Sequence, residues 1–126
     1  MKRPQRELSP LEREVFDALL SCEFHGAEGL RHCLPDMRVE TLDELGSLRL
    51  HSTCEPIPFV SSVPVEGEAR DKDGVLIHVL LHARQGIPVE LEIYKEDGSP
   101  IVDSEALRTL DVFSLPPPPD LSAPSR

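Results

Sequence analysis

Residues 71–101 read DKDGVLIHVLLHARQGIPVELEIYKEDGSPI, and this stretch decides the fold. Apolar side chains alternate with other side chains along both of its halves. The apolar positions of this alternation are Val75, Ile77, Val79, Leu81, Val89, Leu91 and Ile93. Successive side chains of a strand point to opposite faces, so the spacing predicts two strands that share an apolar face. Asp-Gly dipeptides near both ends are typical of tight turns, and we therefore predict a β-hairpin.

The other face of this hairpin carries the unusual chemistry. It combines histidines and carboxylates with apolar groups, at Leu76, His78, Leu80, His82, Glu90, Glu92 and Tyr94. His78 and His82 lie about 13 Å apart along a strand that rises about 3.3 Å per residue, so they need a third element to share one metal ion. A cross-strand pair of one histidine and one glutamate is the more plausible contact.

The rest of the chain predicts helices first and strands afterwards. Ser9 and Glu12 form the S-x-x-E capping box of a helix that is expected to end near Cys22. A second, shorter helix is expected between Gly26 and Pro35. Strands are expected at 39–41, at 47–52 and, irregularly, at 59–70, and a last short strand or helical turn at 101–113. In the irregular strand, Pro64 and Gly67 indicate a sheet edge or a bulge, and an exposed edge there favours dimerisation.

This order of elements predicts an α+β fold, in which an N-terminal helical hairpin packs on an antiparallel β-meander of about five strands. The chain has 126 residues, which fits one domain, and we assign it to residues 9–113. Residues 1–8 are expected to be a mobile basic lead, and the proline-rich residues 114–126 a disordered tail. There is no run of about 18 apolar residues and no secretory signal, so a cytoplasmic location is predicted.

The cysteines and histidines raise the question of zinc. They cluster at Cys22, His25, His32, Cys33, His51 and Cys54. Cys22 and Cys33, however, fall on the apolar stripes of the two predicted helices, where a free cysteine packs as a small hydrophobic group. Three cysteines without a secretory signal also predict reduced thiols and no disulfide framework. We predict no metal and no cofactor.

Catalytic signatures are weak throughout. The sequence Asp71-x-Asp73-Gly74 resembles the start of a calcium loop, but position 12 of that loop is His82 instead of glutamate, so a turn is predicted. No nucleophile elbow and no phosphate-binding glycine loop is present. The protein is therefore predicted to be a non-enzyme.

The net charge narrows the choice of partner. It is −10 at pH 7, with a pI near 4.8. This charge argues against nucleic acid and anionic membranes, which are bound through basic residues. A basic protein fits better, and the chain itself is expected to be a monomer or a homodimer.

Five segments together resemble a family of small uncharacterised bacterial proteins: LSPLEREVFDALL, GAEGLRHCLP, LDELGSLRL, VPVEGEARDKDGVLIHVLLH and ELEIYKEDGSPI. The resemblance covers most of residues 8–113. It implies the fold and a bacterial cytosolic origin, and it brings no catalytic residues. Small acidic proteins of this kind often resemble the immunity proteins of bacterial toxin systems, which cover the active site of a cognate toxin. This last step is an analogy between folds.

The predicted function is a non-enzymatic binding protein of the immunity or antitoxin type, whose acidic sheet face engages a basic protein such as a nuclease toxin. The residues predicted to contact this partner are Glu66, Glu68, Asp71, Asp73, His78, His82, Glu90, Glu92, Tyr94, Glu96 and Asp97. The alternative is a small-ligand or metal-binding domain. It would use His78, His82 and Glu92 in a pocket beneath the helices.

Overall fold

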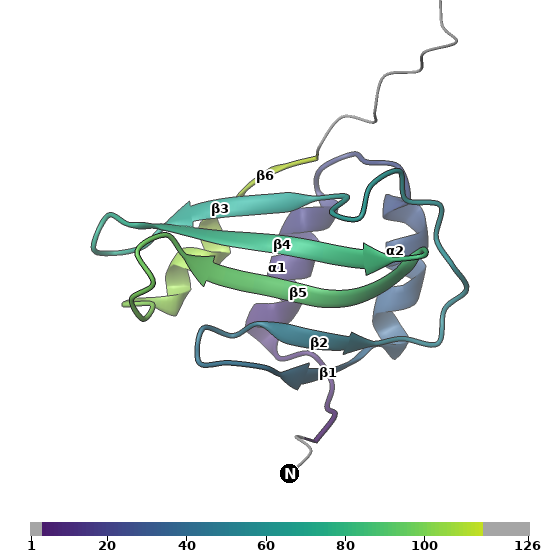
Figure 1. Cartoon of the computed structure of the whole chain (residues 1–126), viewed down its shortest axis with the longest axis horizontal. Helices are drawn as coiled ribbons and strands as arrows, with labels where there is room; N and C mark the ends of the chain where they lie inside the picture. The colour runs from purple at the N-terminus through teal and green to yellow at the C-terminus, as the bar shows by residue number, and fades with distance from the viewer. Residues whose placement is uncertain (1–3, 115–126) are drawn as a thin grey trace, which may run out of the picture.

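The computed structural model describes residues 4–114. Within this range two α-helices lie on one side of a six-stranded antiparallel sheet (Figure 1). The helices are α1 (Pro10–Leu20) and α2 (Ala27–Cys33), with short 3-10 helices η1 (Leu34–Asp36) and η2 (Ser104–Thr109). The strands are β1 (Arg38–Thr41), β2 (Leu48–His51), β3 (Glu66–Arg70), β4 (Leu76–Arg84), β5 (Ile87–Lys95) and β6 (Asp111–Phe113). The predicted α+β fold is confirmed, and the predicted disordered tail lies outside the described residues, except for Ser114.

Helix α1 begins at the predicted capping box. The Glu12 backbone N–H donates to Ser9 Oγ at 3.2 Å, and the Ser9 N–H donates to Glu12 Oε1 at 2.8 Å. Arg6 adds a contact that the sequence did not reveal, because its guanidinium donates to both Glu12 oxygens at 2.7 and 2.8 Å. Its backbone also exchanges two hydrogen bonds with Val39. Arg6 and the buried Leu8 therefore belong to the fold, whereas a mobile lead was expected here.

The strand order is β1-β2-β5-β4-β3-β6, which differs from a simple meander. The hairpin of β4 and β5 forms as predicted, but β2 pairs with β5, so the connection 52–65 carries the chain across to the other side of the hairpin. β6 then pairs with β3. Gly67 lies between β4 and β6, so the edge expected at this glycine is already paired. The expected strand 59–70 is regular only over β3.

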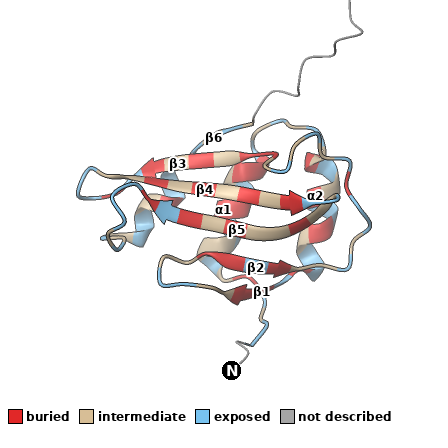
Figure 2. Ribbon diagram, in the orientation of Figure 1, coloured by how far each residue is buried: buried red, intermediate tan, exposed pale blue. Residues whose placement is uncertain are grey.

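The inward face of the hairpin matches the prediction except at its ends. Ile77, Val79 and Leu81 alternate as buried residues along β4, as the period of two requires (Figure 2). Val75 precedes the strand, and Val89 is only half-buried. The register places His82 opposite Glu90 and Ala83 opposite Pro88, so Val89 is the extra residue of a β-bulge and Pro88 takes the inward position. The bulge could not be read from the alternation.

The helices bury their apolar stripes on this face of the sheet. The largest fully buried side chains of the two layers come from both helices and four strands: Phe16, Leu19, Leu30, Val39, Leu48, Ile77, Val79, Leu81 and Leu91. The core is aliphatic, as a chain with no Trp and one Tyr requires. Among residues 4–114, no helix combines the length and the apolar character that crossing a membrane would need.

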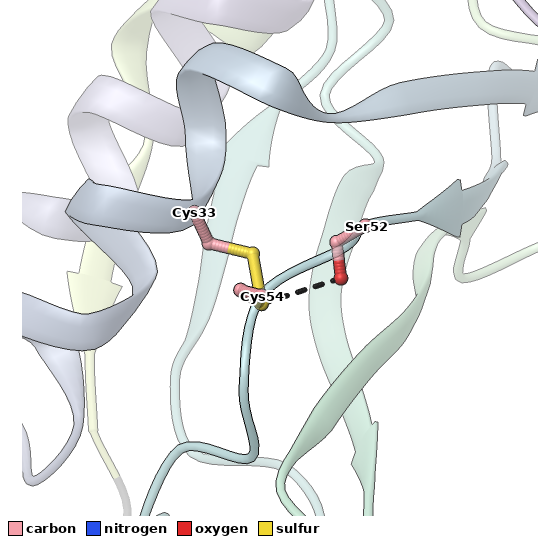
Figure 3. The surroundings of a disulfide bond; sticks show 3 residues. All are labelled: Cys33, Ser52 and Cys54. Carbon is pink, nitrogen blue, oxygen red and sulfur yellow. Dashed lines mark hydrogen bonds between the residues drawn. A yellow bond between two sulfur atoms is a disulfide. The ribbon is translucent and has the colours of Figure 1, made fainter.

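Cys33 and Cys54 form a disulfide, which corrects the prediction of reduced thiols (Figure 3). Cys33 ends α2 and Cys54 lies in the connection after β2, 21 residues later. The fold brings their Cα atoms to 5.5 Å, a distance that suits a disulfide. Cys22 remains a free thiol. Because two of the three cysteines are bonded to each other, the cysteine and histidine cluster does not supply the thiolates of a zinc site.

Candidate functional site

The side of the sheet that faces away from both helices is the candidate site, and we call the part formed by β3 to β6 the open face (Figure 1). In residues 4–114, no helix lies over it. Its side chains include Glu66, Glu68, Arg70, Leu76, His78, Leu80, His82, Arg84, Glu90, Glu92, Tyr94, Asp111 and Phe113. Most of them are half-buried by their neighbours (Figure 2). The exposed ones are Arg70, Arg84, Tyr94, Asp111 and Phe113.

Of the two histidines on the open face, His82 is the one that lies close to the carboxylates of Glu90 and Glu92. Its Nε2 lies 2.8 Å from Glu92 Oε1, which confirms the predicted cross-strand pair of one histidine and one glutamate. Glu90 stands directly opposite His82 in the register. One ligand atom from each of these three side chains lies within 4.8 Å of the other two.

His78 has different neighbours. Its ring stacks on the ring of Tyr94, with centroids 4.8 Å apart and planes at 19°. Its Nε2 lies 3.8 Å from Glu96 Oε1, and this nitrogen is buried without a hydrogen-bond partner among the described residues. The structure therefore keeps His78 and His82 apart, and the three-residue group of His78, His82 and Glu92 is not formed.

One of the two carboxylates of β3 faces another carboxylate, whereas Glu66 stands between Phe113 and Leu80. Glu68 stands opposite Asp111 of β6 on one side and opposite His78 on the other. Within the described part of the chain, no hydrogen bond or ion pair is formed by the side chains of Glu66, Glu68 or Asp111. Like charges directly opposite each other destabilise a sheet. This edge of the open face is thus a site of uncompensated negative charge.

Asp71 and Asp73 occupy a different environment from the one predicted. Asp71 is buried, and its Oδ2 lies 2.8 Å from Nζ of Lys95, whose side chain is also fully buried. The same ammonium donates to Asp73 Oδ2 at 2.5 Å and to the carbonyl of Pro100 at 3.0 Å. Asp71 therefore points away from any partner. Asp73 is partly exposed but engaged by Lys95.

The ion pair of Asp71 and Lys95 has a structural role. Burial alone would raise the pKa of Asp71, but the hydrogen bond from Lys95 and those from the backbone N–H groups of Val102, Lys72 and Asp103 hold it well below its usual range. Burial likewise lowers the pKa of Lys95, and its bonds to Asp71 and Asp73 more than restore it, so that it is raised. Both groups are charged at neutral pH. The ion pair and these hydrogen bonds connect the turn after β3 to the end of β5 and to the segment that follows it.

Glu96 and Asp97 lie in the turn that follows β5, at one end of the open face, and both are exposed. The hydroxyl and the backbone N–H of Ser99 donate to Asp97 Oδ1 at 2.6 and 3.0 Å. These bonds lower the pKa of Asp97. Asp97 therefore shapes the turn, while the carboxylate of Glu96 is directed toward His78.

A pocket does lie beneath α1, but on the other side of the sheet from the histidines. It has a volume of about 500 Å³ and is lined mainly by apolar side chains. Leu91 and Ile93 contribute to its wall from the inward face of β5, whereas His78, His82 and Glu92 point to the open face. The alternative that placed these three residues in a pocket beneath the helices is therefore wrong in its geometry. The alternation of β5 separates the two sites.

Lys95 is the residue that sequence reasoning missed. The alternation did contain a signal, because Lys95 follows Leu91 and Ile93 at a spacing of two and so continues the inward face of β5. A lysine at an inward position needs a buried carboxylate. The hairpin pairs Ile77 with Lys95, so the acidic turn at Asp71 that precedes β4 lies beside Lys95 and supplies it.

Three comparisons with known proteins bear on this chain. Residues 5–105 match a family described as "Domain of unknown function (DUF6984)". No curated protein and no solved structure is detectably similar to the chain.

Proposed function

The chain belongs to this family of unknown function, and we propose that it is a non-enzymatic binding protein that engages a basic protein partner through the open face. The observation that carries the proposal is the unpaired negative charge of β3 and β6. Glu68 and Asp111 stand opposite each other, and among the described residues neither forms an ion pair, which destabilises the sheet. A lysine or arginine of a partner would relieve this repulsion.

The composition of the open face supports a protein partner. Carboxylates surround apolar groups such as Leu80 and the exposed Tyr94 and Phe113. Protein interfaces commonly combine an aromatic or aliphatic centre with a charged rim. Two arginines, Arg70 and Arg84, end β3 and β4 on this side of the sheet. Arg70 donates to the carbonyl of Gly74 at 2.6 Å, and among the described residues neither arginine forms an ion pair with the carboxylates of β3.

Charge complementarity of this kind accelerates association and selects the partner, and salt weakens it. The narrower assignment to an immunity or antitoxin protein stays a prediction, and the identity of the partner would test it.

A cytoplasmic location is part of the proposal. The Cys33–Cys54 disulfide makes this location worth measuring, because disulfides are rare in the cytosol.

The test is a charge reversal on the open face with a matched control. The face variant carries Glu66→Lys and Glu68→Lys. The control carries Asp17→Lys and Asp36→Lys, which change the net charge equally at two exposed positions of the helical layer that make no ion pair in the described chain. Tagged wild type and both variants are incubated with lysate of the source organism at low and high salt, and the retained proteins are quantified by mass spectrometry.

A basic protein should be retained by the wild type and by the control, lost by the face variant, and released at high salt. Equal retention by the face variant would show that the partner binds elsewhere. Retention of no basic protein by the wild type would count against the proposal.

A further inference from the structure

The group formed by His82, Glu90 and Glu92 stands apart from the other histidine and carboxylate contacts. Three other histidines lie near a glutamate: His32 near Glu28 at 3.2 Å, His51 near Glu40 at 2.5 Å and His78 near Glu96 at 3.8 Å. Among residues 4–114, only His82 has a third potential metal ligand beside its pair. The three ligand atoms lie within 4.8 Å of one another, so a small rotation of these half-buried side chains would bring all three into contact with one ion.

The backbone explains why the three side chains meet. β4 and β5 are adjacent, His82 stands opposite Glu90, and Glu92 lies two residues further on the same face. The bulge at Val89 directly follows this pair in the register. Bulges increase the local twist and redirect the neighbouring side chains. The arrangement is built on two paired strands and is therefore held more firmly than a group on a loop.

The carboxylate of Glu90 has no other role in the fold. Among the described residues, it makes no hydrogen bond and no ion pair, although Arg49 stands opposite it on β2. Two glutamates are thus held next to each other with one imidazole, and in the described chain neither forms an ion pair with a lysine or an arginine. A divalent cation would balance both carboxylates and accept the histidine nitrogen at the same time.

We propose that His82, Glu90 and Glu92 bind a divalent transition-metal ion of the zinc type. One imidazole with two carboxylates suits such an ion, whereas magnesium and calcium prefer ligand sets of oxygen alone. His82 and Glu92 have side-chain exposures of 34% and 40%, so an ion can enter from solvent. Three protein ligands leave a coordination position open to water or to a side chain of a bound molecule.

This site lies on the same open face as the proposed protein interaction, but its ligands are not the carboxylates of β3 and β6 that carry that proposal. His82→Ala removes a metal ligand and leaves the carboxylates of β3 in place. Glu66→Lys with Glu68→Lys reverses the charge of β3 and leaves all three ligands in place. Either property can therefore be lost without the other.

The experiment measures the affinity for zinc by calorimetric titration of the chelator-treated, full-length protein. The variants are His82→Ala and Glu90→Gln, and the second keeps the shape of a side chain that makes no fold contact. The controls are His51→Ala and His32→Ala, which each remove a histidine from a histidine–glutamate pair that lacks a third ligand. Cobalt, whose visible spectrum reports its coordination, provides an independent readout.

The wild type should bind zinc at a single site, and both controls should bind it equally well. Loss of even an outer-shell partner typically weakens metal binding about 10–100-fold, so loss of His82 or Glu90 should weaken it at least about 10-fold. The intense visible bands of low-coordinate cobalt should disappear in the same two variants. Zinc affinity that is unchanged by Glu90→Gln, or reduced equally by His51→Ala, would overturn the proposal.

Discussion

Reduction of the Cys33–Cys54 disulfide should destabilise the protein by an amount that follows from its place in the chain. The two cysteines are 21 residues apart, and the segment between them contains β1 and β2. In the chain-entropy account, a cross-link over this separation removes conformational freedom from the unfolded chain worth about 3 kcal/mol at about 25 °C. For a domain of this size, that loss lowers the melting temperature by about 10 °C.

The assay is equilibrium unfolding in urea, followed by circular dichroism with and without a phosphine reductant. The midpoint should fall on reduction. The slope of the free energy against urea should rise, because the unfolded chain without its cross-link exposes more surface. Cys22→Ala serves as the control, since Cys22 is the free thiol and its loss should leave the response to reductant unchanged.

Before any unfolding is done, counting the reactive thiols checks that the Cys33–Cys54 disulfide is present. The oxidised protein should offer one reactive thiol in denaturant, Cys22, and the reduced protein all three cysteines. Identical midpoints for the oxidised and reduced forms would refute the argument from loop length. A lower midpoint with an unchanged slope would show that the disulfide acts on the folded state instead.

Two further predictions concern the acidic residues. Asp71→Asn should destabilise the protein at neutral pH, because it leaves the ammonium of Lys95 buried with one carboxylate fewer. Folding lowers the pKa of Asp71, so the stability that this carboxylate contributes is present above about pH 4 and is lost as the pH falls. The variant should therefore lose less stability than the wild type between about pH 7 and about pH 3. Thermal unfolding over this range measures both effects, and parallel pH profiles would contradict the ion pair. Glu68→Gln should stabilise the protein by about 0.2–1 kcal/mol at low salt, because it relieves the repulsion from Asp111. This gain in stability should shrink as salt is added. Urea unfolding measures it, and a loss of stability would mean that Glu68 has a favourable partner in the fold.

The sequence by itself determined the features that depend on near neighbours in the chain. The capping box at Ser9 and Glu12 was predicted because its hydrogen bonds span three residues. The hairpin of β4 and β5 and the composition of its two faces followed from the period of two and a short turn. The His82–Glu92 pair could be anticipated for the same reason, since the turn sets which residues stand across from each other.

Only the tertiary structure decided the features that join distant segments. The pairing of β2 with β5, the ion pair of Asp71 with Lys95 and the Cys33–Cys54 disulfide link residues that no local pattern relates. The group of His82, Glu90 and Glu92 also needed the register to be known, because the bulge at Val89 places Glu90, instead of Val89, opposite His82. Alternation reports the direction of a side chain along its own strand. It carries no information on which strand becomes its neighbour, and that choice is made by the packing of the whole sheet against its helices.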